Sequence, residues 1–150
     1  MASKSERFTS LGKIQQQHHE RALQAEKEAQ QVVDDIDMSI AKVREYQQDY
    51  LNSLNQMQEK RASSDQLARM RSFIQQLMQM ETEQLLQRAQ AQKQVAKLHA
   101  KTLHQSQKVR MHNKLVEQAE AEQLVHIKKQ ESKHMDSVAN TIFVRRTSNV

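Results

Sequence analysis

The stretch KRASSDQLARM, residues 60–70, contains the one clear break in an otherwise continuous helical pattern. Ser63, Ser64 and Asp65 have side chains that compete for backbone hydrogen bonds, which favours a turn. Gln66 follows Ser63 at the spacing of a capping box, so a second helix is expected to begin at this point. Two helices joined by so short a turn are expected to be antiparallel neighbours.

The composition extends this expectation to the whole chain of 150 residues. It contains one glycine, no proline and no cysteine, and it is rich in residues with high helix propensity. A mean hydropathy of -0.90 leaves too little apolar material for a thick globular core. We therefore predict an all-α fold, a long antiparallel two-helix coiled-coil hairpin that forms a single domain over residues 1–150. The predicted segments are a first helix over about 4–60, a turn over about 61–64, a second helix over about 65–140 and a frayed C-terminal tail.

Apolar residues recur mostly at steps of three and four, which is typical of a coiled-coil stripe. If the turn centres on about residue 62, position j of the first helix lies near position 124 minus j of the second. The acidic residues between 26 and 37 then face the basic stretch around 87–98, which supports this register. Beyond about residue 120 the second helix has no partner, and this segment is expected to project, fray or dock elsewhere. The two stripes contain Ala22, Ala25, Ala29, Val32, Val33, Ile36, Ile40, Val43, Tyr46, Tyr50, Leu54 and Met57, then Leu67, Met70, Ile74, Leu77, Leu85, Ala91, Val95, Leu98, Val109, Val116 and Ala119.

The only two tyrosines, Tyr46 and Tyr50, lie one helical turn apart and differ by about 40° of rotation, so they share a face. The predicted register places Tyr50 near Phe73 and Ile74, and Tyr46 near Leu77 and Met78. Apolar residues of the second helix cover a wider arc there than one partner helix can bury. Any one of them is more simply explained as core, but the cluster as a whole indicates a binding surface.

Two sequence blocks in this region resemble the flagellar export protein FliJ family: YQQDYLNSLN before the turn and SFIQQLMQME after it. The resemblance implies an antiparallel coiled-coil stalk of the type III export apparatus. Such a stalk would be seated in the pore of the hexameric ATPase FliI, contact the gate protein FlhA and handle export chaperones. It would be cytoplasmic and associated with the inner-membrane apparatus through its partners only. The family's gate-binding face maps onto Val43, Tyr46, Tyr50, Phe73 and Leu77.

A second candidate surface is basic. Lys108, Arg110 and Lys114 belong to a stretch without acids, and the facing residues 8–25 offer only Glu20 as an acid. In a stalk seated within a ring, such a stretch suits acidic pore loops, and we expect it to contact the ATPase. The simpler alternative is a solvated basic face.

Catalysis has almost no support in the sequence. No glycine-rich loop could hold a phosphate, no cysteine could act as a nucleophile, and no cofactor is expected. From residue 99 onward successive histidines are separated by five, eight or fourteen residues, not by the three or four that align two metal ligands on a helix. We predict a non-enzymatic protein without a metal site, whose histidines are solvated.

Three alternatives to a flagellar stalk stay open at this point: a virulence-type secretion stalk, a generic coiled-coil scaffold and a basic nucleic-acid-binding protein. The net charge of +5 favours nucleic-acid binding, but the cations are scattered and no aromatic residue lies among them between residues 74 and 142. No nucleic acid is therefore expected as a partner. A scaffold would be recognised by self-association. No stretch has the length and apolarity of a membrane span or of a signal peptide, which favours the cytosol.

Overall fold

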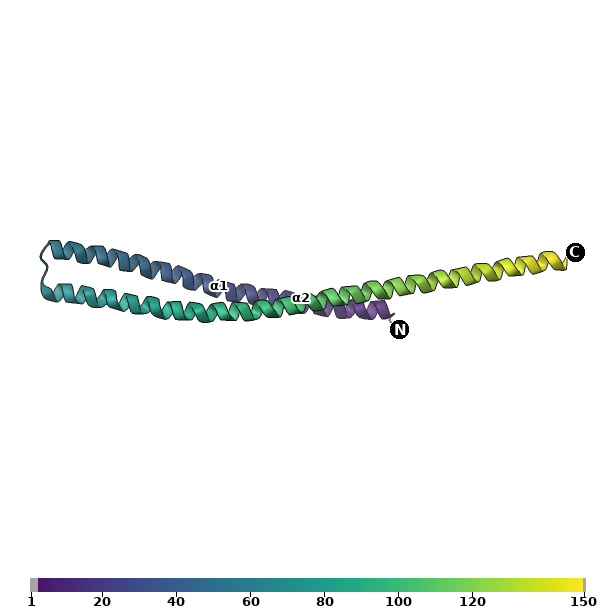
Figure 1. Ribbon diagram of the computed structural model, residues 1–150, viewed down its shortest axis with the longest axis horizontal. Coiled ribbons are helices and arrows are strands. Elements are labelled where there is room, and N and C mark those ends of the chain that lie inside the picture. The colour runs from purple at the N-terminus through teal and green to yellow at the C-terminus, as the bar shows by residue number, and fades with distance from the viewer. Residues whose placement is uncertain (1–2, 150) are drawn as a thin grey trace. The chain divides into compact units, whose positions relative to one another are not determined.

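The computed structural model describes residues 3–149, and these form two helices, α1 (Lys4–Glu59) and α2 (Ser64–Ser148), with no strand among them (Figure 1). The prediction of an all-α hairpin of two helices is confirmed. The bounds of α1 and the start of α2 agree with the predicted ones to within a residue.

Both helices begin at the serines that the sequence pattern indicated. At the start of α1 the capping box is reciprocal: the Glu6 N–H donates to Ser3 Oγ at 3.2 Å, and the Ser3 N–H donates to Glu6 Oε2 at 3.0 Å. At the start of α2 the Gln66 N–H donates to Ser63 Oγ at 3.3 Å. Each serine satisfies a backbone N–H that has no partner within its helix.

The C-terminal end of α1 is closed by a Schellman motif. The Ala62 N–H donates to the Met57 carbonyl at 3.0 Å and the Arg61 N–H donates to the Gln58 carbonyl at 3.2 Å. Arg61 itself has a φ of 54°, which lies in the left-handed region. Glycine is the usual residue at this position because any Cβ crowds the following carbonyl there.

Arg61→Gly is therefore expected to stabilise the turn. Relief of the crowding at Cβ should outweigh the extra flexibility of the unfolded chain and raise the free energy of unfolding by about 0.5 to 1 kcal/mol. Thermal denaturation followed by circular dichroism measures the effect. Arg61→Ala is the matched control, because it removes the same side chain but keeps the Cβ and should change stability little. Equal stabilisation by both variants would mean that the arginine side chain, and not its backbone conformation, is unfavourable.

The predicted end of the second helix is wrong. α2 continues past residue 140 to Ser148, so the segment expected to fray is helical. The physical reason is that this segment contains no proline or glycine to end a helix, and local propensity sustains it without a partner.

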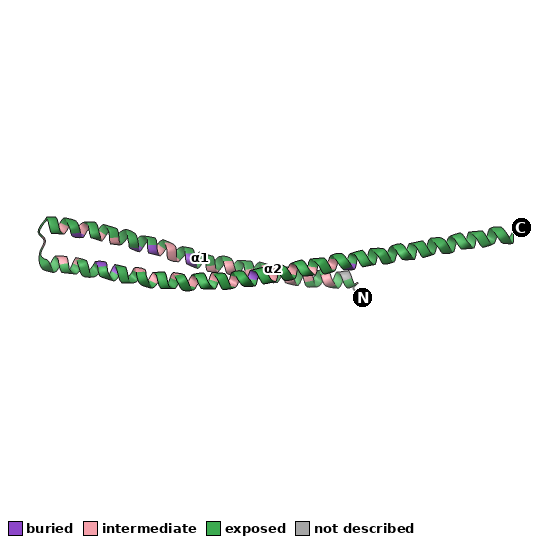
Figure 2. Ribbon diagram, viewed as in Figure 1, coloured by how far each residue is buried: buried purple, intermediate pink, exposed green. Residues whose placement is uncertain are grey.

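Contacts divide the chain into two units, and residues 20–104 form one of them. In this unit the blue part of α1 and the teal part of α2 run antiparallel, and the buried residues lie on their facing sides (Figure 2). We define the seam as the set of positions on each helix that follow one another at alternating intervals of three and four residues. All of these residues are buried or half-buried. The seam consists of Ala22, Glu26, Ala29, Val33, Ile36, Ile40, Val43, Gln47, Tyr50, Leu54 and Met57 on α1 and of Leu67, Met70, Ile74, Leu77, Glu81, Gln84, Arg88, Ala91, Val95, Leu98 and Thr102 on α2.

Three residues expected in the apolar stripes are instead exposed: Val32, Tyr46 and Leu85. Each lies next to a seam position, where the strict heptad spacing turns the side chain away from the partner helix. The stripes are thus narrower than the apolar pattern indicated.

The other unit combines residues up to His19 with those from Gln105 onward. Its helices are joined by polar as well as apolar contacts, among them the Gln105 Nε2 that donates to Gln15 Oε1 at 2.6 Å. From position 120 to its end at Ser148 every residue of α2 is exposed. The prediction that this segment has no partner on the first helix is confirmed, whereas the assignment of residues 1–150 to one domain stays a prediction.

Candidate functional site

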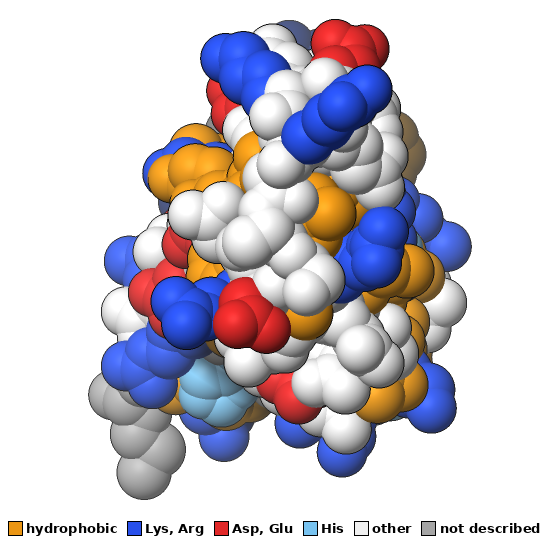
Figure 3. Space-filling view, turned by 90° about the vertical axis from the view of Figure 1, so that its left-hand side faces the viewer, with side chains coloured by type: hydrophobic (Ala, Val, Ile, Leu, Met, Phe, Trp, Pro, Cys, Tyr) orange, Lys and Arg blue, Asp and Glu red, His pale blue; other side chains and the backbone are white. Residues whose placement is uncertain are grey.

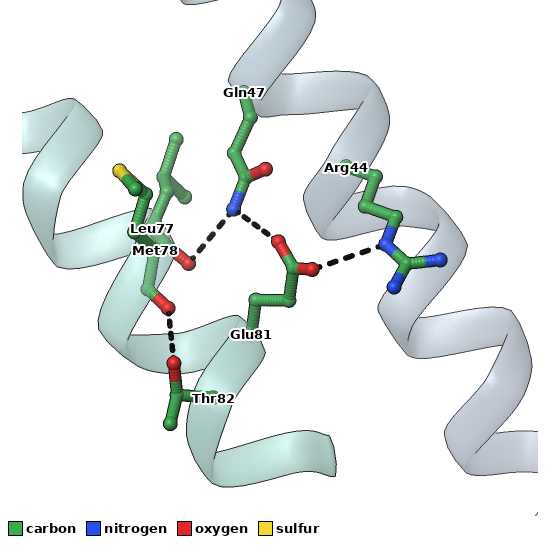
Figure 4. Close-up of polar contacts among 6 residues, drawn as sticks. All are labelled: Arg44, Gln47, Leu77, Met78, Glu81 and Thr82. Carbon is green, nitrogen blue, oxygen red and sulfur yellow. Dashed lines mark hydrogen bonds and ion pairs between the residues drawn. The ribbon is translucent and has the colours of Figure 1, made fainter.

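Polar layers interrupt the seam and show how the two helices are aligned. The Gln47 Nε2 donates to Glu81 Oε2 at 2.8 Å and to the Leu77 carbonyl at 3.3 Å, and Arg44 Nε pairs with Glu81 Oε1 at 3.1 Å (Figure 4). These pairs lie within a few residues of the predicted register. Glu81 is thus a polar residue of the seam whose carboxylate is satisfied by hydrogen bonds from α1.

Further polar pairs continue along residues 20–104. Gln84 Nε2 donates to Ser39 Oγ at 2.7 Å, and Arg88 forms an ion pair with Asp37. Of the acidic residues expected to face the basic stretch, Asp37 is the one that pairs with a lysine or arginine of α2 in the described residues. Three others accept hydrogen bonds from glutamines one turn earlier in α1, because such pairs at i and i+4 meet without reaching across the seam. They are Glu28, Asp34 and Asp35.

Two seam glutamates are held in their charged form. The hydrogen bond from Gln47, and after it the one from Arg44, lowers the pKa of Glu81 below its ordinary value. The pKa of Glu26 is lowered first by its hydrogen bond with His99, whose Nδ1 lies 2.7 Å from Glu26 Oε1, and then by Thr102. Both carboxylates therefore stabilise the paired helices when they are ionised.

These shifts predict how stability depends on pH. A glutamate whose pKa is lowered by folding stabilises fully above its unfolded pKa of about 4.3, and the stabilisation is lost as pH falls through the folded value. The denaturation midpoint of the chain should therefore fall on acidification below about pH 4.3. Glu81→Gln should lower the midpoint at neutral pH and weaken its dependence on acid. Glu83→Gln is the control, because within residues 3–149 Glu83 is exposed and has no hydrogen bond or ion pair. The same acid profile in all three proteins would contradict the assignment.

An aromatic pair joins the seam residue Tyr50 to Phe73, which lies at the edge of the seam towards the turn. The rings of Tyr50 and Phe73 meet edge to face with centroids 4.7 Å apart and planes at 70°. This contact confirms that Tyr50 lies near Phe73. Phe73 nevertheless stays 41% exposed and Tyr46 54% exposed. The proximity of Tyr46 to Leu77 and Met78 stays a prediction.

The five residues proposed for gate binding thus fall into two groups. Val43 and Leu77 are only 5% and 6% exposed, inside the seam, where a partner cannot reach them while the helices stay paired. Tyr46 and Phe73 each precede a seam residue by one position, and in an antiparallel pair such positions lie on the same side of the seam. With Tyr50 between them, they form a surface that we call the aromatic flank.

Tyr50 and Phe73 of the aromatic flank also line an open apolar depression of about 700 Å³, which continues towards the turn. Figure 3 looks onto this end and shows hydrophobic side chains at the surface beside basic ones. We call this depression the turn pocket. The sequence reasoning missed it, although a methionine and a basic residue lie close together on either side of the turn in the sequence. It is lined by Tyr50, Met57, Lys60, Ala62, Gln66, Arg69, Met70 and Phe73.

The basic candidate residues do not gather on one face of α2. Arg110 and Lys114 are one turn apart and differ by about 40° of helical rotation, whereas Lys108 points about 160° away from Arg110. All three are exposed, and none forms an ion pair within residues 3–149. The structure therefore brings together two of these three cations.

The histidines are less solvated than expected. His99 pairs with Glu26, and His19 and His112 are half-buried, each with an Nδ1 that is buried without a hydrogen-bond partner in the described residues. The heptad spacing brings the latter two to the interior side of their helices. In the part of the chain that the structure describes, no three histidine or acidic side chains are grouped as metal ligands, and no helix is long and apolar enough to cross a membrane.

A scan against protein-family models shows what the paired helices belong to. The model of the flagellar FliJ protein matches residues 3–148, which include the whole of both helices. The chain belongs to the flagellar FliJ family. FliJ proteins are non-enzymatic components of the flagellar export apparatus, which implies protein partners. Comparison with curated proteins and with solved structures gives no match.

Proposed function

We propose that this FliJ-family chain is a stalk and adaptor of the flagellar type III export apparatus, which couples the export ATPase FliI to the gate protein FlhA and to export chaperones. The turn end of the hairpin would bind the gate, and the unit formed by residues up to 19 and from 105 onward would engage the ATPase ring. The family assignment supports a role in the flagellar export apparatus.

The observation that carries this proposal is the aromatic flank. Tyr46 and Phe73 expose aromatic rings beside a seam in which Val43, Ile74 and Leu77 are buried. Exposed tyrosine and phenylalanine on a rigid support are typical of residues that dominate binding energy at interfaces. The buried Val43 and Leu77 would contribute by holding the helices that carry these rings.

The basic residues Arg110 and Lys114, with Lys108 on another face, support the proposed contact with the ATPase ring. Cations without partners attract acidic pore loops over several ångströms and form contacts that salt weakens. Such contacts allow the stalk to move against the ring instead of being locked to it. A stalk bound at both ends would transmit the conformational cycle of the ring to the gate. Such coupling requires that the affinity of the stalk differs between the conformational states of the ring.

Tyr46→Ala tests the gate contact. The ring is half exposed and forms no hydrogen bond within residues 3–149, so the folded helices should be unaffected. We expect binding to the cytoplasmic linker of the gate protein to weaken by roughly 10- to 30-fold, the usual effect of removing an aromatic hot spot. Isothermal titration calorimetry on the full chain measures it.

Met38→Ala is the matched control. Met38 is an exposed apolar residue of the same helix, about 160° away from the rotational position of the nearby seam residue Ile40. Its replacement should leave gate binding unchanged. If Tyr46→Ala and Met38→Ala bind the gate linker equally well, the aromatic flank is not the gate-binding surface.

A further inference from the structure

The turn pocket combines apolar walls with a basic rim. Tyr50 and Phe73 form one wall through their edge-to-face contact, and Met57 and Met70, both half-buried, extend the apolar surface towards the turn. These four side chains come from the end of α1 and the start of α2. The pocket therefore exists only when the turn holds the two helix ends together.

The rim has an excess of positive charge. Lys60 and Arg69 line the pocket and are exposed, and neither forms an ion pair with any residue between 3 and 149. No acidic residue lines the pocket. Two unpaired cations beside an apolar surface are complementary to an apolar group that is flanked by carboxylates.

The shape of the pocket indicates the kind of ligand. A volume of about 700 Å³ is comparable with the pockets that hold small molecules. This pocket, however, lies on the surface between two helix ends, so it suits side chains that project from a peptide backbone. The thioethers of Met57 and Met70 can adapt to different apolar side chains.

We propose that the turn pocket binds an acidic protein segment by inserting one or two of its apolar side chains between the methionines and the aromatic pair. Lys60 and Arg69 pair with carboxylates on either side of the inserted residues. This inference rests on the proposed function in one respect, namely that the turn end is the end that binds a protein partner. It adds the chemical class of the partner segment and a site that the aromatic flank alone does not include.

Two labelled peptides of about twelve residues test the proposal by fluorescence anisotropy on the full chain. Both carry a central Phe-Leu pair, flanked by aspartate and glutamate in one peptide and by lysine in the other. The unaltered chain should prefer the acidic peptide by about 10-fold, as expected for two rim charge pairs. In the variant Lys60→Glu with Arg69→Glu the preference should be reversed.

The matched control is Lys93→Glu with Lys97→Glu. These exposed lysines of α2 give the same change in net charge, and neither lines the turn pocket. This variant should keep the preference for the acidic peptide. If both variants lose the preference for the acidic peptide equally, the preference arises from the net charge of the chain and the proposal is overturned.

Two further outcomes would also overturn it. An acidic peptide with serine in place of the Phe-Leu pair should bind at least 10-fold more weakly, and equal binding would mean that no apolar side chain is inserted. Binding to phosphatidylglycerol vesicles that depends on Lys60 and Arg69, without discrimination between the peptides, would assign the surface to lipid. Tyr46 does not line the pocket, so the two proposals can fail separately. If Tyr46→Ala loses gate binding but the unaltered chain shows no preference between the peptides, this inference is overturned and the proposed function stays intact.

Discussion

Leu77→Ala is expected to lower the free energy of unfolding of the paired helices by about 2 to 3 kcal/mol. Leu77 is only 6% exposed, and its replacement leaves a cavity between α1 and α2. The cost should lie at the lower end of the range for leucine in protein cores, because a seam of two helices can collapse more easily than a globular core. Urea denaturation of the full chain, followed by circular dichroism, measures the loss.

Met78→Ala is the control for this prediction. Met78 is the next residue of the same helix and is 58% exposed, so its truncation should change stability by less than about 0.5 kcal/mol.

The same two variants also show what Leu77 contributes to gate binding. If Leu77→Ala weakens binding to the gate linker while stability is unchanged, Leu77 is a contact residue and the seam opens when the partner binds. If both properties fall together, Leu77 acts by supporting the aromatic flank.

Reversal of Lys108, Arg110 and Lys114 to glutamate is expected to weaken stimulation of the cognate export ATPase by roughly 10-fold or more. All three side chains are exposed and have no ion pair within the described residues, so the helical content should be retained. Gate binding that depends on Tyr46 should also be retained, because the aromatic flank belongs to residues 20–104. Steady-state ATP hydrolysis, measured at low and at physiological salt, reports the effect.

Two controls separate a specific contact from net charge. Lys93→Glu with Lys97→Glu changes charge on residues 20–104 and should leave stimulation unchanged. Since Arg110 and Lys114 share a face and Lys108 does not, reversing the first two should account for most of the loss if a single ring surface contacts α2. Undiminished stimulation in the triple variant at both salt concentrations would leave the basic stretch as a solvated surface.

Local chemistry made much of the fold predictable from the sequence. Ser3 and Ser63 begin the helices because their hydroxyls accept backbone N–H groups that lack partners. The short turn then requires antiparallel helices, and the spacing of apolar residues aligns Tyr50 with Phe73. Each of these expectations depends on neighbours along the chain or on one pairing rule, and for this reason they could be made without coordinates.

The exposure of individual side chains depended on packing between the helices. Tyr46 and Val43 are both apolar residues of one stripe, yet the strict heptad spacing buries one and exposes the other. Likewise, Glu81 joins the seam because Gln47 and Arg44 of the facing helix satisfy its charge.

The sequence by itself therefore determined two helices, their turn, their register and the family. The tertiary structure alone decided which rings form the aromatic flank, how polar residues enter the seam and that Arg61 takes a left-handed conformation to close α1. The physical reason is that helix formation and capping are local, whereas burial and the pairing of charges are settled by residues far apart in the chain.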